Sequence, residues 1–182
     1  MANFEKTPTI QEVIHRRRAN ILSTQGYISL ALRCLTLALV LLVLLTQVFL
    51  ITQVSGNDMF PAVKDGDLVF AYRLQSDLSK NDVVVYTAAG RSRVGRILGR
   101  PGDVIMLDDS GKLLVNGTNQ AGEILYPTYA KEGLTYPFPV PEDSVFVLGD
   151  YRTQTEDSRD FGPIPMKNIQ GKVITILRRR GI

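Results

Sequence analysis

Histidine, cysteine and tryptophan are almost missing from this sequence of 182 residues, which holds one histidine, one cysteine and no tryptophan. The histidine, His15, and the cysteine, Cys34, both lie before residue 55. Everything after residue 54 therefore lacks the groups for disulfides, for zinc clusters of Cys and His, and for catalytic triads that need Cys or His. We expect no metal and no cofactor, and any hydrolysis in this part would depend on Lys, Asp, Glu, Ser or Thr.

Charge is distributed unevenly along the chain. Five of the 21 Lys and Arg and two of the 18 Asp and Glu lie in residues 1–54, which leaves sixteen of each sign in residues 55–182. The larger part is electrically neutral, so a nucleic-acid partner is not expected. The length and the 45% hydrophobic content predict one folded domain with an appendage and argue against a disordered chain.

A long uncharged run precedes this domain. The segment Cys34–Val54 carries no charge, and as a helix it would measure roughly 30 Å, enough to cross a bilayer. A cleaved secretory signal or a buried soluble helix are weaker alternatives, because the run is long and no Ala-x-Ala site follows it. Arg16–Arg18 and Arg33 favour a cytoplasmic N-terminal side. We predict a cytoplasmic head (1–31), a single transmembrane helix (32–54) and an extracellular domain (55–182) on the cell membrane.

The pattern after residue 54 is typical of β-structure. Short runs rich in Val, Ile, Leu, Phe and Tyr are separated by turn signals such as Lys-Asp-Gly-Asp and Pro-Gly-Asp. They predict strands at 67–72, 82–86, 104–107, 112–115, 144–148 and 172–177, with a hairpin within 109–117 and a tight turn at Asn116-Gly117. Residues 126–141, rich in Pro and aromatics, predict an extended surface loop. The expected fold class is mainly β, preceded by one transmembrane α-helix.

Four segments of this domain resemble motifs of the type I signal peptidases. They are Val54–Asp67, similar to Gly-x-Ser-Met-x-Pro followed by Gly-Asp; Arg96–Asp103, similar to Arg-Val-Ile-Gly-x-Pro-Gly-Asp; Lys112–Gly117, similar to Leu-x-Val-Asn-Gly; and Phe146–Gly162, similar to Gly-Asp-Asn-Arg-x-x-Ser-x-Asp-Ser-Arg-x-x-Gly. The resemblance covers residues 33–176. It implies a signal-peptidase-like β domain whose relatives cleave signal peptides with a Ser nucleophile and a Lys general base.

The sequence departs from this pattern where the chemistry is expected. Asp58 occupies the position of the nucleophilic Ser, and Gly95 that of the general-base Lys. An ionised Asp58 is a weak nucleophile and opposes a developing oxyanion, while Gly95 has no side chain, so loss of activity is expected. The resemblance further implies a structural pair of Asp157 and Arg159. It also implies a peptide groove or partner-binding site formed by Gly56, Asp58, Met59, Phe60, Pro61, Gly95 and Thr155.

These departures predict a protein that is not an enzyme. The resemblance to dyad-lacking signal-peptidase-like proteins of Gram-positive pilus gene clusters implies an accessory or chaperone-like role in pilus assembly, with pilin subunits or a sortase as partners. An active signal peptidase or protease with relocated catalytic residues is the alternative, using Asp58 with Asp157 or Asp65, or Lys64 as base. A decoy that restrains preprotein processing is a further alternative.

Overall fold

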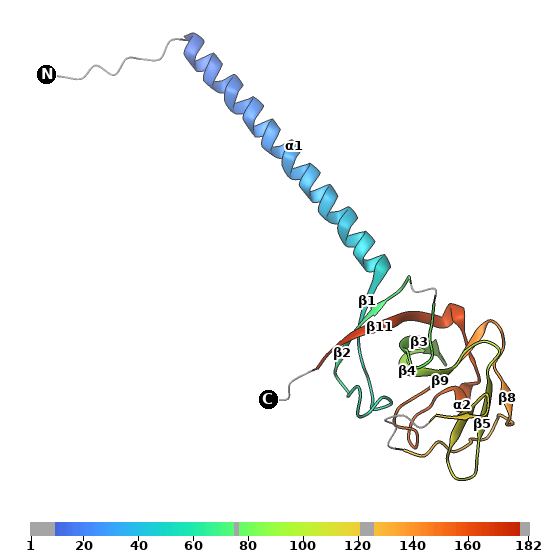
Figure 1. Ribbon diagram of the computed structural model, residues 1–182. Helices are drawn as coiled ribbons and strands as arrows, with labels where there is room; N and C mark the ends of the chain where they lie inside the picture. The colour runs from blue at the N-terminus through green and yellow to red at the C-terminus, as the bar shows by residue number, and fades with distance from the viewer. Residues whose placement is uncertain (1–9, 75–76, 121–125, 179–182) are drawn as a thin grey trace. The chain divides into compact units, whose positions relative to one another are not determined.

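The computed structural model describes residues 10–74, 77–120 and 126–178, and it divides the chain into two compact units, Met1–Thr46 and Gln47–Ile182. The first unit is helical and the second consists mainly of β-strands (Figure 1). Residues 1–9 of the predicted cytoplasmic head lie outside the described residues. The division into a cytoplasmic head, a transmembrane helix and an extracellular domain therefore stays a prediction.

Helix α1 covers Ile10–Val48. Within it, Thr24–Val48 is long and apolar enough to cross a membrane, and none of its most apolar window is buried. Two hydroxyls inside this stretch donate to the preceding turn, Thr36 Oγ1 to the Arg33 carbonyl and Thr46 Oγ1 to the Val43 carbonyl, each at 2.8 Å. Such bonds give each hydroxyl a hydrogen-bond partner, which the hydrocarbon core of a bilayer would not provide.

The prediction that this helix continues to residue 54 is wrong at its C-terminal end. Residues Phe49–Gln53 form strand β1, which pairs antiparallel with β2 (Leu68–Tyr72) in the register Phe49 to Tyr72 and Gln53 to Leu68. An uncharged apolar segment can form either a helix or a strand. Phe49–Gln53 form a strand because they make the hydrogen-bonded ladder with β2.

The second unit holds two antiparallel sheets. The larger has the order β1-β2-β11-β3-β4-β9-β10 and the smaller β7-β6-β5-β8. The bounds not yet given are β3 Val83–Ala88, β4 Arg91–Gly99, β5 Val104–Leu107, β6 Leu113–Val115, β7 Thr118–Asn119, β8 Phe138–Pro139, β9 Ser144–Leu148, α2 Ser158–Phe161, β10 Ile164–Pro165, the 3-10 turn Met166–Asn168 and β11 Ile169–Leu177.

The core lies between the sheets and around β9, every residue of which is buried. Leu98, Phe146 and Leu148 of the larger sheet pack in one cluster with Ile105 and Val115 of the smaller. Each such side chain contributes about 1.5–3 kcal/mol of hydrophobic stabilisation. This packing fixes β4 and β9, and these strands carry much of the candidate site.

The predicted fold class is confirmed, and all six predicted strands are present within a few residues of their expected ends. The turn at Asn116 and Gly117 is confirmed as well, since both residues have positive φ, 53° and 76°. Strand β4 was not predicted, although it is one of the two longest. Arginines at 91, 93 and 96 and glycines at 95 and 99 hide its pattern. Residues 126–141 form a loop apart from β8, where Phe138 pairs with Ile105.

Candidate functional site

Asp58 lies on the loop between β1 and β2, and this loop is held at several points. Gly66 N donates to the Val54 carbonyl at 2.9 Å, which closes the base of the loop. Gly56 N donates to the Asp65 carboxylate at 2.7 Å, and Val63 N donates to the carbonyl of the fully buried Met59 at 2.8 Å. The loop therefore presents Asp58 from a fixed backbone.

A second loop, which follows β9, is bonded directly to the Asp58 backbone. Tyr151 N donates to the Asp58 carbonyl at 3.0 Å. This approach requires glycine at position 149, because a Cβ there would lie 2.6 Å from the same carbonyl oxygen and 2.5 Å from Thr155 Cγ2. Position 149 thus joins the two loops at the site.

The Asp58 carboxylate faces a cation that sequence analysis missed. Arg93 Nη1 lies 3.7 Å from Asp58 Oδ2, and Arg93 Nη2 forms an ion pair with Glu156 Oε2 at 2.6 Å. The guanidinium also lies over the Phe161 ring, 4.8 Å from its centroid. Asp58 and Glu156 are therefore two carboxylates joined through one arginine.

Burial raises the pKa of the Asp58 carboxyl above its usual value. Arg93 opposes this rise, while the charges of Asp157 and Glu156 add to it and Lys131 lowers it slightly. The side chain is 30% exposed, so it is reachable from solvent. A partly desolvated carboxyl with a raised pKa is a candidate for accepting or donating a proton.

A small pocket opens at this carboxyl, and we call it the Asp58 pocket. Its volume is about 40 Å³. It is lined by Thr52, Gln53, Val54, Ser55, Asp58, Met59, Ser92, Arg93 and Val94, from the end of β1, the following loop and the start of β4. No group of three His, Cys, Asp or Glu suited to a metal ion occurs in the described ranges.

Position 95 has no free space for a side chain. A Cβ on Gly95 would lie 2.6 Å from Val147 Cγ1, 3.0 Å from Tyr86 Cε1 and 3.3 Å from the Leu148 carbonyl oxygen. Tyr86 is buried, and burial raises the pKa of its phenol, with Asp157 adding to the rise. The volume next to Gly95 is therefore occupied by Val147 and by a neutral tyrosine ring.

Thr155, Asp157 and Arg159 form a buried cluster behind the pocket. Thr155 Oγ1 donates to Asp157 Oδ2 at 2.9 Å, and Arg159 donates to both carboxylate oxygens at 2.9 and 2.8 Å. Asp157 Oδ1 also accepts from Arg159 N and caps α2. Lys131, from the 126–141 loop, donates to the Thr155 carbonyl at 2.5 Å and to Asp160 at 2.6 Å.

The other residues considered from sequence lie around this centre in different settings. Phe60 packs against Tyr151 with ring centroids 6.0 Å apart, and the bond from Phe60 to Pro61 is cis. Lys64 Nζ lies 6.0 Å over the Phe60 ring, and Asp65 is engaged by Gly56 N. Asp157 forms an ion pair with Arg159. Each of the three residues considered as a partner for Asp58 therefore contacts another group.

Arg93, Glu156 and Tyr86 are the site residues that the sequence did not reveal. Arg93 pairs with Tyr86 across β3 and β4, and Gly95 lies two residues further along β4. Residues two apart on a strand share a face, so Arg93 and Gly95 face the same side. Recognising β4 as a strand would have been the signal that places Arg93 beside position 95.

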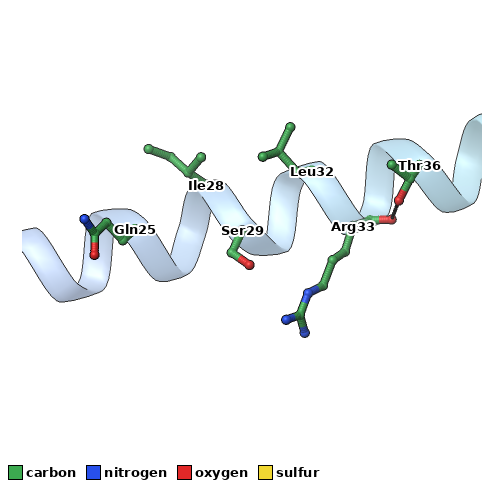
Figure 2. A pocket seen from close by; sticks show the side chains of 6 residues that line it. All are labelled: Gln25, Ile28, Ser29, Leu32, Arg33 and Thr36. Atoms are coloured by element: carbon green, nitrogen blue, oxygen red, sulfur yellow. Dashed lines mark hydrogen bonds between the residues drawn. The ribbon is translucent and has the colours of Figure 1, made fainter.

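A second hollow runs along α1 and lacks acid or base chemistry. It measures about 350 Å³ and is lined by Gln25, Ile28, Ser29, Leu32, Arg33 and Thr36. Ile28 and Leu32 project to one side of the helix in Figure 2, and Ser29 and Arg33 project to the other. Arg33 is the one charged residue among these six, so the Asp58 pocket is the better candidate site.

The β domain, with two loops that meet beside β4 to form the candidate site, indicates the class of protein. Comparison with known proteins identifies the family. Residues 27–177 match the family model described as "Signal peptidase, peptidase S26". The chain belongs to the signal peptidase, peptidase S26 family.

Several known proteins are similar to this chain. Probable thylakoidal processing peptidase 2 of Arabidopsis thaliana is 37% identical over 66% of this chain and 36% of its own length. Signal peptidase I of Bacillus amyloliquefaciens is 30% identical over 76% of this chain and 82% of its own length. A crystal structure of a signal peptidase I from Enterococcus faecalis is 25% identical, covering 55% of this chain and 98% of that chain, with a TM-score of 0.43. The matched segments span 36% and 39% of the two thylakoidal relatives.

These names contradict the prediction that the chain is not an enzyme, because the relatives are named as peptidases. The reasoning behind that prediction weighed Asp58 and Gly95, with Asp65, Asp157 and Lys64 as possible substitutes for the missing groups. The fold brings further charged groups, Arg93 and Glu156, to the same centre. None of the named relatives is a pilus protein, so the pilus role stays a prediction.

Proposed function

We propose that this chain is a membrane-anchored peptidase that cleaves precursors of exported proteins at the Asp58 pocket. The observation that carries the proposal is the half-buried Asp58 carboxyl, with its raised pKa and the Arg93 guanidinium 3.7 Å away. Membership of the peptidase S26 family supports the same class of reaction.

The edge of β4 offers a place for the substrate backbone. Strand β4 pairs with β9 from Arg96 onward, and residues 92–95, which precede this pairing, pair with β3. Ser92, Arg93 and Val94 at this edge also line the Asp58 pocket. An extended peptide adds to such an edge through main-chain hydrogen bonds, which would bring a peptide bond beside Asp58.

The proposed reaction is hydrolysis with Asp58 as general base. The water oxygen bonds to the peptide carbonyl carbon while the Asp58 carboxylate accepts one proton from that water. The C–N bond then breaks, and Asp58 returns the proton to the leaving nitrogen, which yields one carboxyl and one amine terminus. A carboxylate whose pKa is raised by burial serves both steps better than an ordinary aspartate.

The proposed topology places the β domain outside the cytoplasm on a single span. The basic residues Arg16–Arg18 precede the apolar stretch Thr24–Val48, and the positive-inside rule keeps them cytoplasmic. A Cys34→Ser, Ser110→Cys variant in intact cells tests this, because a membrane-impermeant maleimide should label the exposed position 110. Labelling only after lysis would overturn the orientation.

The proposed activity is tested with the full chain in detergent and a synthetic preprotein peptide with an apolar core and an Ala-x-Ala site. We expect cleavage by the natural protein and a loss of about 10²–10⁴-fold in Asp58→Asn. Asp109→Asn makes the same chemical change at an exposed turn and serves as the control. Absence of cleavage by the natural protein, or full activity of Asp58→Asn, would overturn the proposal.

A second candidate function is an accessory role in pilus assembly, in which the same groove holds a segment of a pilin or a sortase. The filled space at Gly95 favours it, because peptide binding at the β4 edge needs no side chain at that position. Deleting the gene and probing pilus polymerisation by immunoblot tests this role. Normal polymers would exclude it, and faster preprotein processing would indicate a decoy instead.

A further inference from the structure

Arg93 is set into the candidate site by its strand and is mostly shielded from water. Its position on β4, opposite Tyr86, directs it to the face that Gly95 shares. The side chain is 12% exposed, and it lines the Asp58 pocket. In such a setting the charge of a guanidinium acts through a lower local dielectric than water offers.

Two contacts fix the orientation of the Arg93 guanidinium. Nη2 pairs with Glu156 at 2.6 Å, and the Phe161 ring lies 4.8 Å from the guanidinium carbon. Glu156 is 64% exposed, so this pair contributes little to folding stability. The arrangement is better explained as orientation of Arg93 than as a device for stability.

Two nitrogen donors of Arg93, Nη1 and Nε, make no hydrogen bond within the described part of the chain. Nη1 is 3.7 Å from Asp58 Oδ2, which is too long for a hydrogen bond. Nε is buried and finds no hydrogen-bond partner within the described part of the chain. A buried donor without a hydrogen-bond partner is costly and uncommon, and a role in catalysis is one physical explanation for it.

We propose that Arg93 is a catalytic residue that donates to the carbonyl oxygen of the peptide bond at Asp58 and stabilises the oxyanion formed there. This inference rests on the proposed peptidase function and names the group that supplies its positive charge. Attack by water places negative charge on that oxygen, next to a carboxyl that is itself acidic. The guanidinium offsets this charge where it develops, which is the type of interaction that lowers a barrier most.

The test compares three variants of the full chain in detergent, using the same preprotein peptide. Arg93→Met removes the charge, Arg93→Lys restores it without the planar fork, and Arg100→Met makes the same change at an exposed residue just after the same strand. We expect kcat to fall about 10²–10³-fold in Arg93→Met with KM changed less than about threefold. Arg93→Lys should recover part of kcat, and Arg100→Met should match the natural protein.

A second measurement does not depend on turnover. A peptide aldehyde, whose hydrate is tetrahedral, is compared with the matching peptide alcohol by their affinities for each variant. We expect the preference for the aldehyde to fall at least about tenfold in Arg93→Met and to persist in Arg100→Met. Glu156→Gln, which frees Arg93 while keeping its charge, should reduce the preference to a smaller extent and serves if Arg93→Met fails to fold.

The outcomes separate this inference from the proposed function. Cleavage by the natural protein with kcat and aldehyde preference unchanged in Arg93→Met overturns the role of Arg93 alone. Absence of cleavage with a lost aldehyde preference overturns the peptidase function and leaves Arg93 as a carbonyl-binding group. Absence of both cleavage and any Arg93 effect overturns both.

Discussion

Replacing Gly95 with alanine is expected to destabilise the β domain, because no other atom fits beside that backbone. The added Cβ would lie 2.6 Å from Val147 Cγ1 and 3.0 Å from Tyr86 Cε1. Val147 and Tyr86 are themselves fully or almost fully buried, so neither can move into solvent. The backbone of Gly95 is also fixed by its pairing with Val84.

The cost follows from overpacking a close-packed core. Inserting one methyl under such constraints costs about 1–3 kcal/mol, because side chains leave their preferred rotamers or the backbone shifts. In a domain of this size each kcal/mol lowers Tm by roughly 2–8 °C. Thermal and urea unfolding of Gly95→Ala beside the natural protein measure this directly. Gly95→Lys should be at least as costly.

A double-mutant cycle isolates the contact between the new Cβ at position 95 and the Val147 side chain. Val147→Ala removes the atom nearest to the new Cβ, so the double variant Gly95→Ala, Val147→Ala should be more stable than the sum of the two single changes predicts. The expected coupling is about 0.5–3 kcal/mol. A destabilisation below about 0.5 kcal/mol for Gly95→Ala, or strict additivity in the cycle, would refute the steric reasoning.

Three further outcomes test other parts of the site. Gly149→Ala should lower Tm in thermal unfolding and reduce any cleavage, because its Cβ would meet the Asp58 carbonyl oxygen at 2.6 Å. Asp157→Asn should cost about 3–5 kcal/mol in urea unfolding, since it leaves the buried Arg159 charge without its ion-pair partner. The raised pKa of Asp58 means that the folded state binds its proton more tightly than the unfolded state. The unfolding free energy of the natural protein relative to Asp58→Asn should therefore fall as pH rises above 3.8, in a series of urea titrations.

Strand β4 shows where sequence patterns stop being informative. Its nine residues contain three arginines and two glycines, so neither alternation nor β propensity marks it. Its identity comes from its neighbours, β3 on one side along Val83–Ala88 and β9 on the other along Phe146–Leu148. Strand β3 is joined to β4 by the turn at Ala89 and Gly90, whereas β9 begins only at Ser144, so local pattern carries no information about the pairing with β9. Missing β4 meant missing Arg93.

The end of α1 is a similar case. An uncharged run of Leu, Val, Thr and Gln suits a helix in lipid, and nothing local marks a change at Phe49. The change occurs because Phe49–Gln53 pair with Leu68–Tyr72, and Phe49 stacks on Phe70 with ring centroids 5.0 Å apart. The ladder and the ring contact are tertiary properties.

The sequence by itself determined the β class, the apolar helix, the turn at Asn116-Gly117 and the motifs that lead to the family. These follow from short-range physics, namely side-chain alternation, hydrophobic length and the φ preferences of turn residues. Only the tertiary structure decided what surrounds Asp58. The Arg93 pair with Glu156 joins residues 63 positions apart, and the absence of space at Gly95 depends on Val147, which is 52 positions away. Such distances are fixed by sheet order and core packing, and no local property of the chain encodes them.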